Sequence, residues 1–331
     1  MHVHISNEWF TISEIIKQVE SKTDIDCSKL KRSKANDVII PCSGETAVDI
    51  ATARCVPFDN ILLGGDLNII SLHKYDGAFM SYQLNGKRKY DIARVAQGVS
   101  VVHLYGEHLK AIKTYNPSLP EQQKIAKLLS LIDERIATQN KIIEKLQSLI
   151  KGIAQHCIKE STSGNTYVKL GDICQITTGK LDANAQVDNG IYPFFTCAEQ
   201  PFKIDSFAFD TEALLISGNG ANLGYINYYK GKFNAYQRTY VLDLFSENIQ
   251  YIKWALKVLL PKRIAIEKSS SNTPYIVLST LTDLRLPIPC KSKQSFIANL
   301  MQSLERKLSN QIAQYDSYNY LKQYLLRQMF I

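Results

Sequence analysis

The sequence predicts an α+β protein in which two mixed α/β modules are separated by two long helices that form an antiparallel coiled coil. Two observations lead to this fold class. The chain resembles itself when it is offset by 172 residues, and two stretches carry apolar residues at heptad spacing. Internal similarity at a fixed offset indicates two copies of one folding unit, which suggests a pseudo-two-fold arrangement.

The repeat sets the expected boundaries along the 331-residue chain. At the offset of 172, Pro117 lies on Pro289 and Gln122 lies on Gln294. At about 150 residues per domain, a chain of this length has room for two modules. The expected order is a first module, a helix, a second module and a second helix, at residues 1–117, 118–160, 161–290 and 291–331.

The opening of the first module is shorter than that of the second. At an offset of 176, the strand residue Val38 falls on Leu214, whereas Ile12 near the start falls on Leu170 at an offset of 158. The first module therefore lacks roughly fifteen residues between its opening and the strand at Val38.

Short apolar runs beside turn residues predict buried strands in each module. The strand candidates are residues 38–40, 213–216, 225–229 and 239–245. Turn residues follow the first two of these runs, at Ser43-Gly44 and Ser217-Gly-Asn-Gly220. Residues 249–260 have helical spacing, and we expect this helix to end before Pro261 because proline lacks the backbone N–H.

The two long helices have the clearest periodicity in the chain. Ser118-Leu-Pro-Glu121 is a capping-box pattern with proline in the first turn, which is typical of a helix start. Steps of three and four residues then define the first seam: Ile125, Leu129, Ile132, Ile136, Gln139, Ile143, Leu146, Ile150, Ile153 and Cys157. The second seam is Ile297, Met301, Leu304, Leu308, Gln311, Tyr315, Tyr318, Lys322, Leu325 and Met329. Such seams predict a coiled coil.

One polar residue stands at the middle of each seam. Gln139 aligns with Gln311 at the offset of 172. If the helices pack antiparallel, the two amides meet, can hydrogen-bond and would fix the register of the coiled coil. Partial exposure of each glutamine is the alternative.

A helix of about 36 residues spans about 54 Å, so antiparallel pairing would hold the modules at opposite ends of a rod. Two similar readers at a fixed spacing suit a bipartite target on a repeating polymer such as duplex DNA, with its helical turn of about 34 Å. The net charge of +8 agrees with a polyanionic partner, but residues 121–159 carry +3 of it and residues 291–331 carry +4. The modules must therefore bind through local patches.

The residues at the first junction resemble a known protein family. The segment Ile112-Lys-Thr-Tyr-Asn-Pro-Ser-Leu-Pro-Glu-Gln-Gln-Lys-Ile125, continuing to Asp133, resembles the junction of specificity (S) subunits of type I restriction-modification systems, and residues 289–304 resemble a second copy. Five further segments are similar to parts of the target recognition domains of that family: 12–15 and 168–173 at the openings, 217–224 with 237–239 inside, and 272–276 before the last strand.

This resemblance implies that each recognition domain reads one half of a split, asymmetric sequence in double-stranded DNA, and that the helices fix the gap. It also implies two methyltransferase (M) subunits, which methylate adenine and carry S-adenosylmethionine, and restriction/translocase (R) subunits that use ATP and Mg. We expect these cofactors on the partner subunits and none on this chain.

The chain itself lacks the motifs of catalysis. It has no Asn/Asp-Pro-Pro-aromatic motif, no phosphate-binding loop and no H-E-x-x-H pattern. We therefore expect a non-catalytic subunit without a metal site. The seven cysteines show no C-x-x-C spacing, and neither a secretory signal nor an apolar run of membrane-spanning length is found, which favours the cytoplasm and no membrane contact.

The candidate DNA-binding residues are polar or basic side chains in the loops that follow strands, where they could reach base edges or phosphates. In the first module they are Ser43, Asp66, Asn68, Lys87, Arg88 and Gln97. In the second they are Thr178, Lys180, Asn219, Asn222, Gln237, Arg238, Ser270 and Asn272. Turn chemistry is the alternative role for the asparagines and serines. Positive clusters also occur at residues 29–34, 87–89 and 253–268.

Three other functions remain open at this stage. The chain could be an assembly adaptor whose modules bind protein, or a defective reader whose first module is too short. It could also bind RNA, because its 18 tyrosines can stack on unpaired bases.

Overall fold

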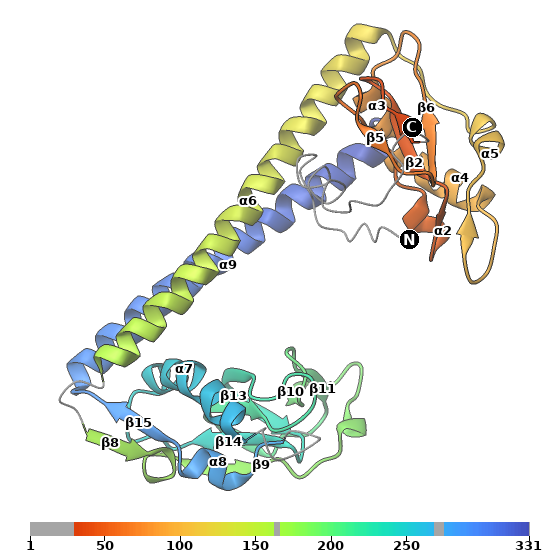
Figure 1. The fold of residues 1–331 in the computed structure, drawn as a ribbon. Coiled ribbons are helices and arrows are strands. Elements are labelled where there is room, and N and C mark those ends of the chain that lie inside the picture. The colour runs from red at the N-terminus through yellow and green to blue at the C-terminus, as the bar shows by residue number, and fades with distance from the viewer. Residues whose placement is uncertain (1–29, 162–165, 268–274, 331) are drawn as a thin grey trace. The chain divides into compact units, whose positions relative to one another are not determined.

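The computed structural model describes residues 30–161, 166–267 and 275–330, which form two compact units (Figure 1). Unit 1 comprises residues 1–143 and 311–331, and unit 2 comprises residues 144–310. The division crosses both long helices, so each unit contains one module together with part of each helix.

Unit 1 is built around a small antiparallel sheet. Its central strand β2 (Val38–Pro41) lies between β4 (Arg54–Cys55) and β6 (Leu67–Ile70). Two further antiparallel pairs join β1 (Lys31–Arg32) to β5 (Leu62–Leu63) and β3 (Ser43–Gly44) to β7 (Val102–His103). The short helices are α2 (Ala47–Ile50), α3 (Gly77–Asn85), α4 (Arg88–Val95) and α5 (Gly106–Lys110).

Unit 1 has two apolar clusters. Val38, Ile40, Ile92 and Leu104 belong to the cluster around the sheet, and each is almost completely buried. The second cluster joins α3 to the long helices, where the rings of Phe79 and Phe330 lie 5.4 Å apart. Burial of this second cluster attaches the module to its helices.

Unit 2 contains a six-stranded sheet with the order β11-β10-β13-β12-β14-β9. All neighbours are antiparallel except β10 and β13. The strands are β9 (Gln175–Thr178), β10 (Tyr192–Phe195), β11 (Phe202–Ile204), β12 (Phe209–Ser217), β13 (Ile226–Ala235) and β14 (Thr239–Asp243). A separate pair joins β8 (Thr166–Lys169) to β15 (Arg285–Ile288), and the remaining short helices are η2 (Leu170–Asp172), η3 (Ala183–Ala185) and α8 (Leu278–Thr282). All four predicted strands are confirmed.

The predicted end of the helix at residue 260 is wrong. Helix α7 (Ile249–Glu267) continues through Pro261. The residues after the proline are held by tertiary contacts: Ile264 packs against the core of unit 2, and Glu267 accepts a 2.7 Å hydrogen bond from Thr280. Proline removes one backbone hydrogen bond, and these contacts offset that loss.

The two long helices are α6 (Leu119–Glu160) and α9 (Lys291–Gln328). They pack antiparallel within each unit: Lys322 pairs with Asp133 at 2.6 Å in unit 1, and Lys293 donates to the carbonyl of Glu160 at 3.1 Å in unit 2. Seven of the ten predicted seam positions of α6 are buried. The fold class, with its two modules and two long antiparallel helices, is confirmed. No helix within the described residues is long and apolar enough to cross a membrane.

The start of α6 is capped by the predicted pair. The amide of Ser118 donates to the carboxylate of Glu121 at 3.0 Å, and the Ser118 hydroxyl donates to the same oxygen at 2.6 Å. These hydrogen bonds lower the pKa of Glu121. The hydroxyl therefore donates to Glu121, whereas in a standard capping box it accepts a backbone amide hydrogen.

The amides of Gln139 and Gln311 are hydrogen-bonded within unit 1. Gln139 Nε2 donates to Gln311 Oε1 at 2.8 Å and to the backbone carbonyl of Gln311 at 3.0 Å. Gln139 is buried and Gln311 is half-buried. The expected contact is therefore present, and its role in setting the register stays a prediction.

A second pair of glutamines shows the repeat at the level of single hydrogen bonds. Gln122 donates to the carbonyl of Pro117 at 2.9 Å and accepts from the amide of Asp76, the N-cap of α3, at 2.9 Å. At the offset of 172, Gln294 donates to the carbonyl of Pro289 at 2.9 Å and accepts from the amide of Asn248 at 3.1 Å. In both units a buried glutamine thus ties a long helix to the start of a module helix.

Candidate DNA interface

The turn between β13 and β14 in unit 2 carries two of the predicted DNA-binding residues. Its backbone is held from three sides. The amide of Tyr236 donates to Phe195 at 2.9 Å, the amide of Gln237 to Leu181 at 2.9 Å, and the amide of Gly218 to Arg238 at 2.8 Å. A turn whose backbone is fixed by neighbouring segments loses little backbone conformational entropy when its side chains bind a partner.

Two glycines allow this close approach. A Cβ atom on Gly179 would lie 1.9 Å from the carbonyl oxygen of Ala235, and a Cβ on Gly218 would lie 2.4 Å from that of Arg238. No other residue type fits at these positions without movement of the backbone. The two glycines therefore bring the segments around residues 179 and 218 directly against the turn.

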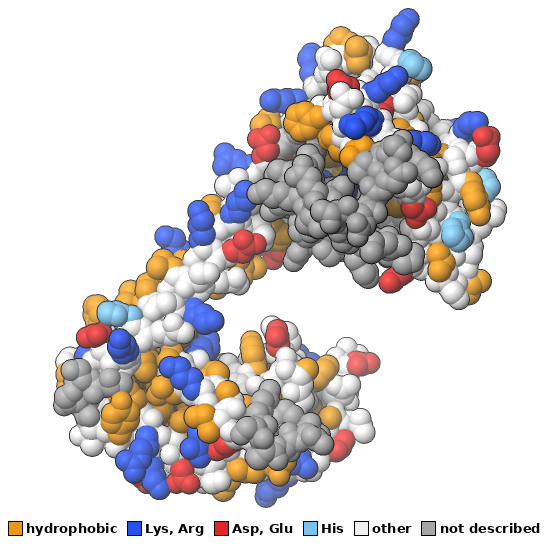
Figure 2. Space-filling model, in the orientation of Figure 1, with side chains coloured by type: hydrophobic (Ala, Val, Ile, Leu, Met, Phe, Trp, Pro, Cys, Tyr) orange, Lys and Arg blue, Asp and Glu red, His pale blue; other side chains and the backbone are white. Residues whose placement is uncertain are grey.

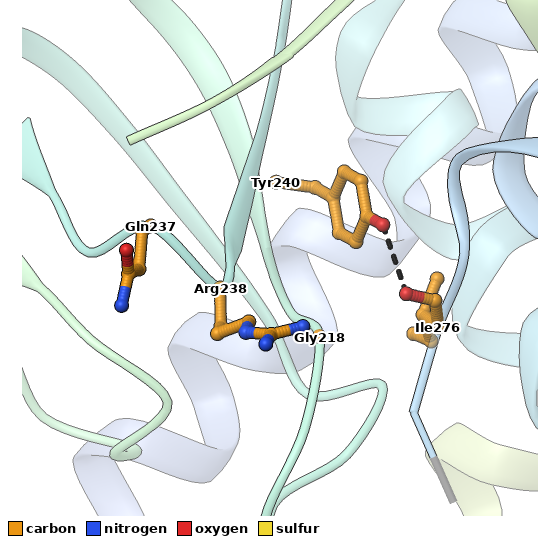
Figure 3. Close-up of a pocket in the computed structure, with 5 residues that line it drawn as sticks. All are labelled: Gly218, Gln237, Arg238, Tyr240 and Ile276. Atoms are coloured by element: carbon orange, nitrogen blue, oxygen red, sulfur yellow. Dashed lines mark hydrogen bonds between the residues drawn. The ribbon is translucent and has the colours of Figure 1, made fainter. Parts of the chain in front are cut away.

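The side chains of Gln237 and Arg238 are exposed at this turn. They line an open pocket together with Gly218, Tyr240 and Ile276 (Figure 3). Figure 3 shows the guanidinium of Arg238 beside Gly218, while Tyr240 donates a 2.8 Å hydrogen bond to the carbonyl of Ile276.

The strand β9 and the loop after it add Thr178 and Lys180 to this site. Thr178 pairs with Tyr240, and Leu181 forms a bridge with Tyr236. Both Thr178 and Lys180 are exposed. The segment therefore runs beside the turn, and it adds an exposed lysine to the site, which suits a polyanion.

Two predicted residues, Asn219 and Asn222, lie in the loop between β12 and β13, and both contact Cys197, which the sequence did not indicate. The thiol of Cys197 donates to Asn219 Oδ1 at 3.0 Å, and the carbonyl of Cys197 accepts from Asn222 Nδ2 at 3.0 Å. Cys197 follows β10 and is distant in sequence from both asparagines, so no local pattern could have indicated it.

The electrostatics of the site reflect its basic side chains. Burial raises the pKa of Tyr240, and the positive charge of Arg238 opposes that rise.

Of the predicted residues of the second module, six are brought together: Thr178, Lys180, Asn219, Asn222, Gln237 and Arg238. Ser270 and Asn272 lie outside the described residues.

In unit 1, three predicted residues lie close together. The hydroxyl of Ser43 donates to the carboxylate of exposed Asp66. Ser43 also pairs with His103, which forms a bridge with Gln97. Asn68, in β6, donates to the carbonyl of Leu104 at 2.9 Å, so its amide holds the segment after β7 against this strand.

Lys87 and Arg88 stand at the start of α4 instead. The guanidinium of Arg88 is 3.3 Å from Asp91 on the same helix, and no contact places either residue beside Asp66. In the positive cluster at residues 29–34, Lys31, Arg32 and Lys34 are exposed, and residue 29 lies outside the described residues.

The positive cluster on α7 is largely neutralised. Lys253 is buried and lies 2.7 Å from Glu305, and Lys257 lies 3.2 Å from the same carboxylate. These cations attach α7 to α9. Figure 2 also shows Lys and Arg side chains along α6, where they are exposed at positions such as Lys124, Lys127 and Lys141.

The described residues contain no group of three or more His, Cys, Asp or Glu side chains that could hold a metal ion.

Comparison with known proteins gives a family match over most of the chain. The model of the type I restriction modification DNA specificity domain matches residues 20–148 and again residues 162–315. The chain belongs to this family. The two matches correspond to the two copies of the internal repeat.

The relatives of this specificity-domain protein are specificity subunits of type I restriction enzymes. Over 137 residues, 41% of this chain and 30% of the relative, it is 44% identical to the type I restriction enzyme EcoDI specificity subunit of Escherichia coli. Over 287 residues, 74% of the chain and 66% of the relative, it is 24% identical to the MjaIX specificity subunit of Methanocaldococcus jannaschii. The matched regions thus cover less than two thirds of each of these relatives.

The fold of the specificity-domain protein is similar to that of solved chains from type I systems. The S subunit of a type I restriction-modification system from M. genitalium matches with a TM-score of 0.66 at 21% identity, over 92% of this chain and 85% of that one. A structure that concerns the assembly and conformational transition of a type I system matches with a TM-score of 0.57 at 17% identity, over 89% and 82%. At these identities the likeness concerns the fold.

Proposed function

We propose that this chain is the sequence-specific DNA-binding subunit of a type I restriction-modification system. The observation that carries the proposal is the turn of unit 2, which is held by backbone hydrogen bonds and exposes Gln237 and Arg238, with Lys180 on the segment that runs along it. Arginine and glutamine are the side chains that pair bidentately with guanine and adenine in the major groove, and lysine binds phosphate. Membership of the specificity-domain family gives the turn its target class.

The proposal assigns methylation and cleavage to partner subunits. Two methyltransferase subunits with S-adenosylmethionine would act on the DNA that this chain selects, and restriction subunits with ATP and Mg would join them in the cytoplasm. This chain would act without catalysis of its own. What supports this division is the absence from its sequence of the methylation and phosphate-loop motifs.

The first test is the binding of the full chain to duplex DNA, with its methyltransferase partner present, over a range of salt concentrations. The logarithm of the association constant should fall linearly with the logarithm of the salt concentration, because phosphate contacts release counterions. Lys180→Ala should weaken binding to all sequences alike and reduce the salt slope by about 1. Arg238→Ala should cost about 1–3 kcal/mol on the preferred sequence only.

Lys230→Ala is the matched control, because Lys230 is an exposed lysine of unit 2 that pairs with Glu212 at 3.6 Å on the middle of the sheet. This variant should bind like the original chain. If the chain shows no preference for any duplex under any condition, the assembly-adaptor function replaces the proposal.

A further inference from the structure

The turn that carries Arg238 has a counterpart in unit 1, and the residue there has the opposite charge. In unit 1 the amide of Cys42 donates to the carbonyl of Asp66 at 3.0 Å. In unit 2 the amide of Gly218 donates to the carbonyl of Arg238 at 2.8 Å. Asp66 precedes β6 as Arg238 precedes β14, and both strands pair with the central strand of the repeat, β2 or β12.

We call the hydrogen-bonded backbone of Cys42, Asp66 and Leu104 in unit 1, and that of Gly218, Arg238 and Ile276 in unit 2, the frame of this position. A second hydrogen bond in each unit shows that the two frames are equivalent. The amide of Leu104 donates to the carbonyl of Cys42 at 2.7 Å, and the amide of Ile276 donates to that of Gly218 at 2.8 Å. The offsets are those of the repeat, 172 for Leu104 and Ile276 and 176 for Cys42 and Gly218.

A third hydrogen bond is made by different side chains in the two units but reaches the equivalent carbonyl. Asn68 donates to the carbonyl of Leu104 at 2.9 Å, and Tyr240, at the offset of 172, donates to that of Ile276 at 2.8 Å. Asp66 and Arg238, also 172 residues apart, therefore occupy one position in two copies of the same frame.

The charge at this position is negative in unit 1 and positive in unit 2. Burial and the carboxylate of Asp66 both raise the pKa of the neighbouring Cys42 thiol, whereas Arg238 opposes the rise in the pKa of Tyr240. Asp66 is exposed, and Ser43 orients its carboxylate by donating to one oxygen. An exposed carboxylate is repelled by phosphates, so beside DNA it is useful only where it meets an amino group.

We propose that this equivalent position reads a base in both modules, and that Arg238 selects a guanine while Asp66 selects a cytosine. The inference rests on the proposed function. Arginine donates two hydrogen bonds to O6 and N7 of guanine. A carboxylate only accepts, and the N4 amino group of cytosine only donates. Adenine is disfavoured because its N7 acceptor stands beside its N6 amino group and would face the second carboxylate oxygen.

The experiment is selection of bound sequences from a random duplex pool by the full chain with its methyltransferase partner. Arg238→Ala should lose about tenfold or more discrimination at one guanine of one half-site. Asp66→Ala should lose discrimination at one cytosine of the other half-site. Asp66→Asn should change that preference from cytosine to adenine, because asparagine donates to N7 and accepts from N6.

Glu107→Gln is the control, since Glu107 is an exposed carboxylate of unit 1 that pairs with Lys110 at 2.6 Å. It should leave both half-sites unchanged. Asn at position 66 keeps the shape of the side chain, and thermal unfolding of each variant verifies that it folds.

The outcomes separate the two proposals. If the original chain selects no sequence, the proposed function fails. If it selects a bipartite sequence but the Arg238 and Asp66 variants select the same one, or Asp66→Asn weakens all sequences alike, the assignment of this position is overturned while the function stands.

Discussion

Single residues in this chain differ in character according to what surrounds them. Gly179 and Gly218 have no side chain, and for this reason the segments that contain them can pack directly against the turn of Gln237 and Arg238. The cysteines show the same dependence. Burial raises the pKa of Cys55 to about 11 and that of Cys174 to about 12, whereas hydrogen bonds from Ser292 lower the pKa of exposed Cys290.

The cysteine environments predict an order of alkylation. The thiolate is the nucleophile, so a thiol with a lowered pKa is ionised at a lower pH and reacts faster at pH 8. Iodoacetamide followed by peptide mass spectrometry should modify Cys290 first and Cys55 and Cys174 last. Ser292→Ala should move the reactivity of Cys290 to higher pH. Equal rates at Cys290 and Cys174 would contradict the predicted order.

At the scale of elements, the two long helices combine a mostly apolar seam with one polar contact. Leu129, Ile136 and Ile143 are buried on either side of Gln139, which donates to Gln311. A buried amide that finds its partner in only one alignment opposes a shift of the helices by a turn. We therefore expect the seam to provide stability and the glutamine pair to provide selectivity among registers.

A double-mutant cycle tests the glutamine pair. Gln139→Ala, Gln311→Ala and the double variant should show a coupling free energy of about 0.5–1.5 kcal/mol in denaturant unfolding, as for a partly buried hydrogen bond. Ser130→Ala is a suitable background control, because its hydroxyl bonds only within α6. Additive effects of the two glutamine changes would show that each side chain acts alone.

At the scale of the whole molecule, one plan is used twice with different side chains. The strand order β4-β2-β6 of unit 1 corresponds to β13-β12-β14 in the middle of the larger sheet of unit 2. Gln122 and Gln294 make the same ties in both units. The frame is thus retained between the copies, whereas the exposed residue on it changes from Asp66 to Arg238.

Matched changes in the two units test this equivalence. Gln122→Leu and Gln294→Leu each leave two backbone groups without their partner, and because most of these groups are only partly buried we expect a cost towards the lower end of about 1–3 kcal/mol per group. Hydrogen exchange should increase at the start of α3 in the first variant and at the start of α7 in the second, with the other unit unaffected. Exchange that increases in neither unit would show that the ties do not hold the module helices.

The sequence by itself determined the long helices, the central strands and the duplication, because each is written in a local period or in a fixed offset. It also indicated the polar loop residues around Arg238. It could not indicate Cys197 or the two contact glycines, because these depend on segments that meet only when the chain folds. The continuation of α7 through Pro261 has the same cause, since packing of Ile264 outweighs a local preference. Only the tertiary structure decided that Asp66 and Arg238 share one position, because that equivalence lies in hydrogen bonds between distant backbone groups.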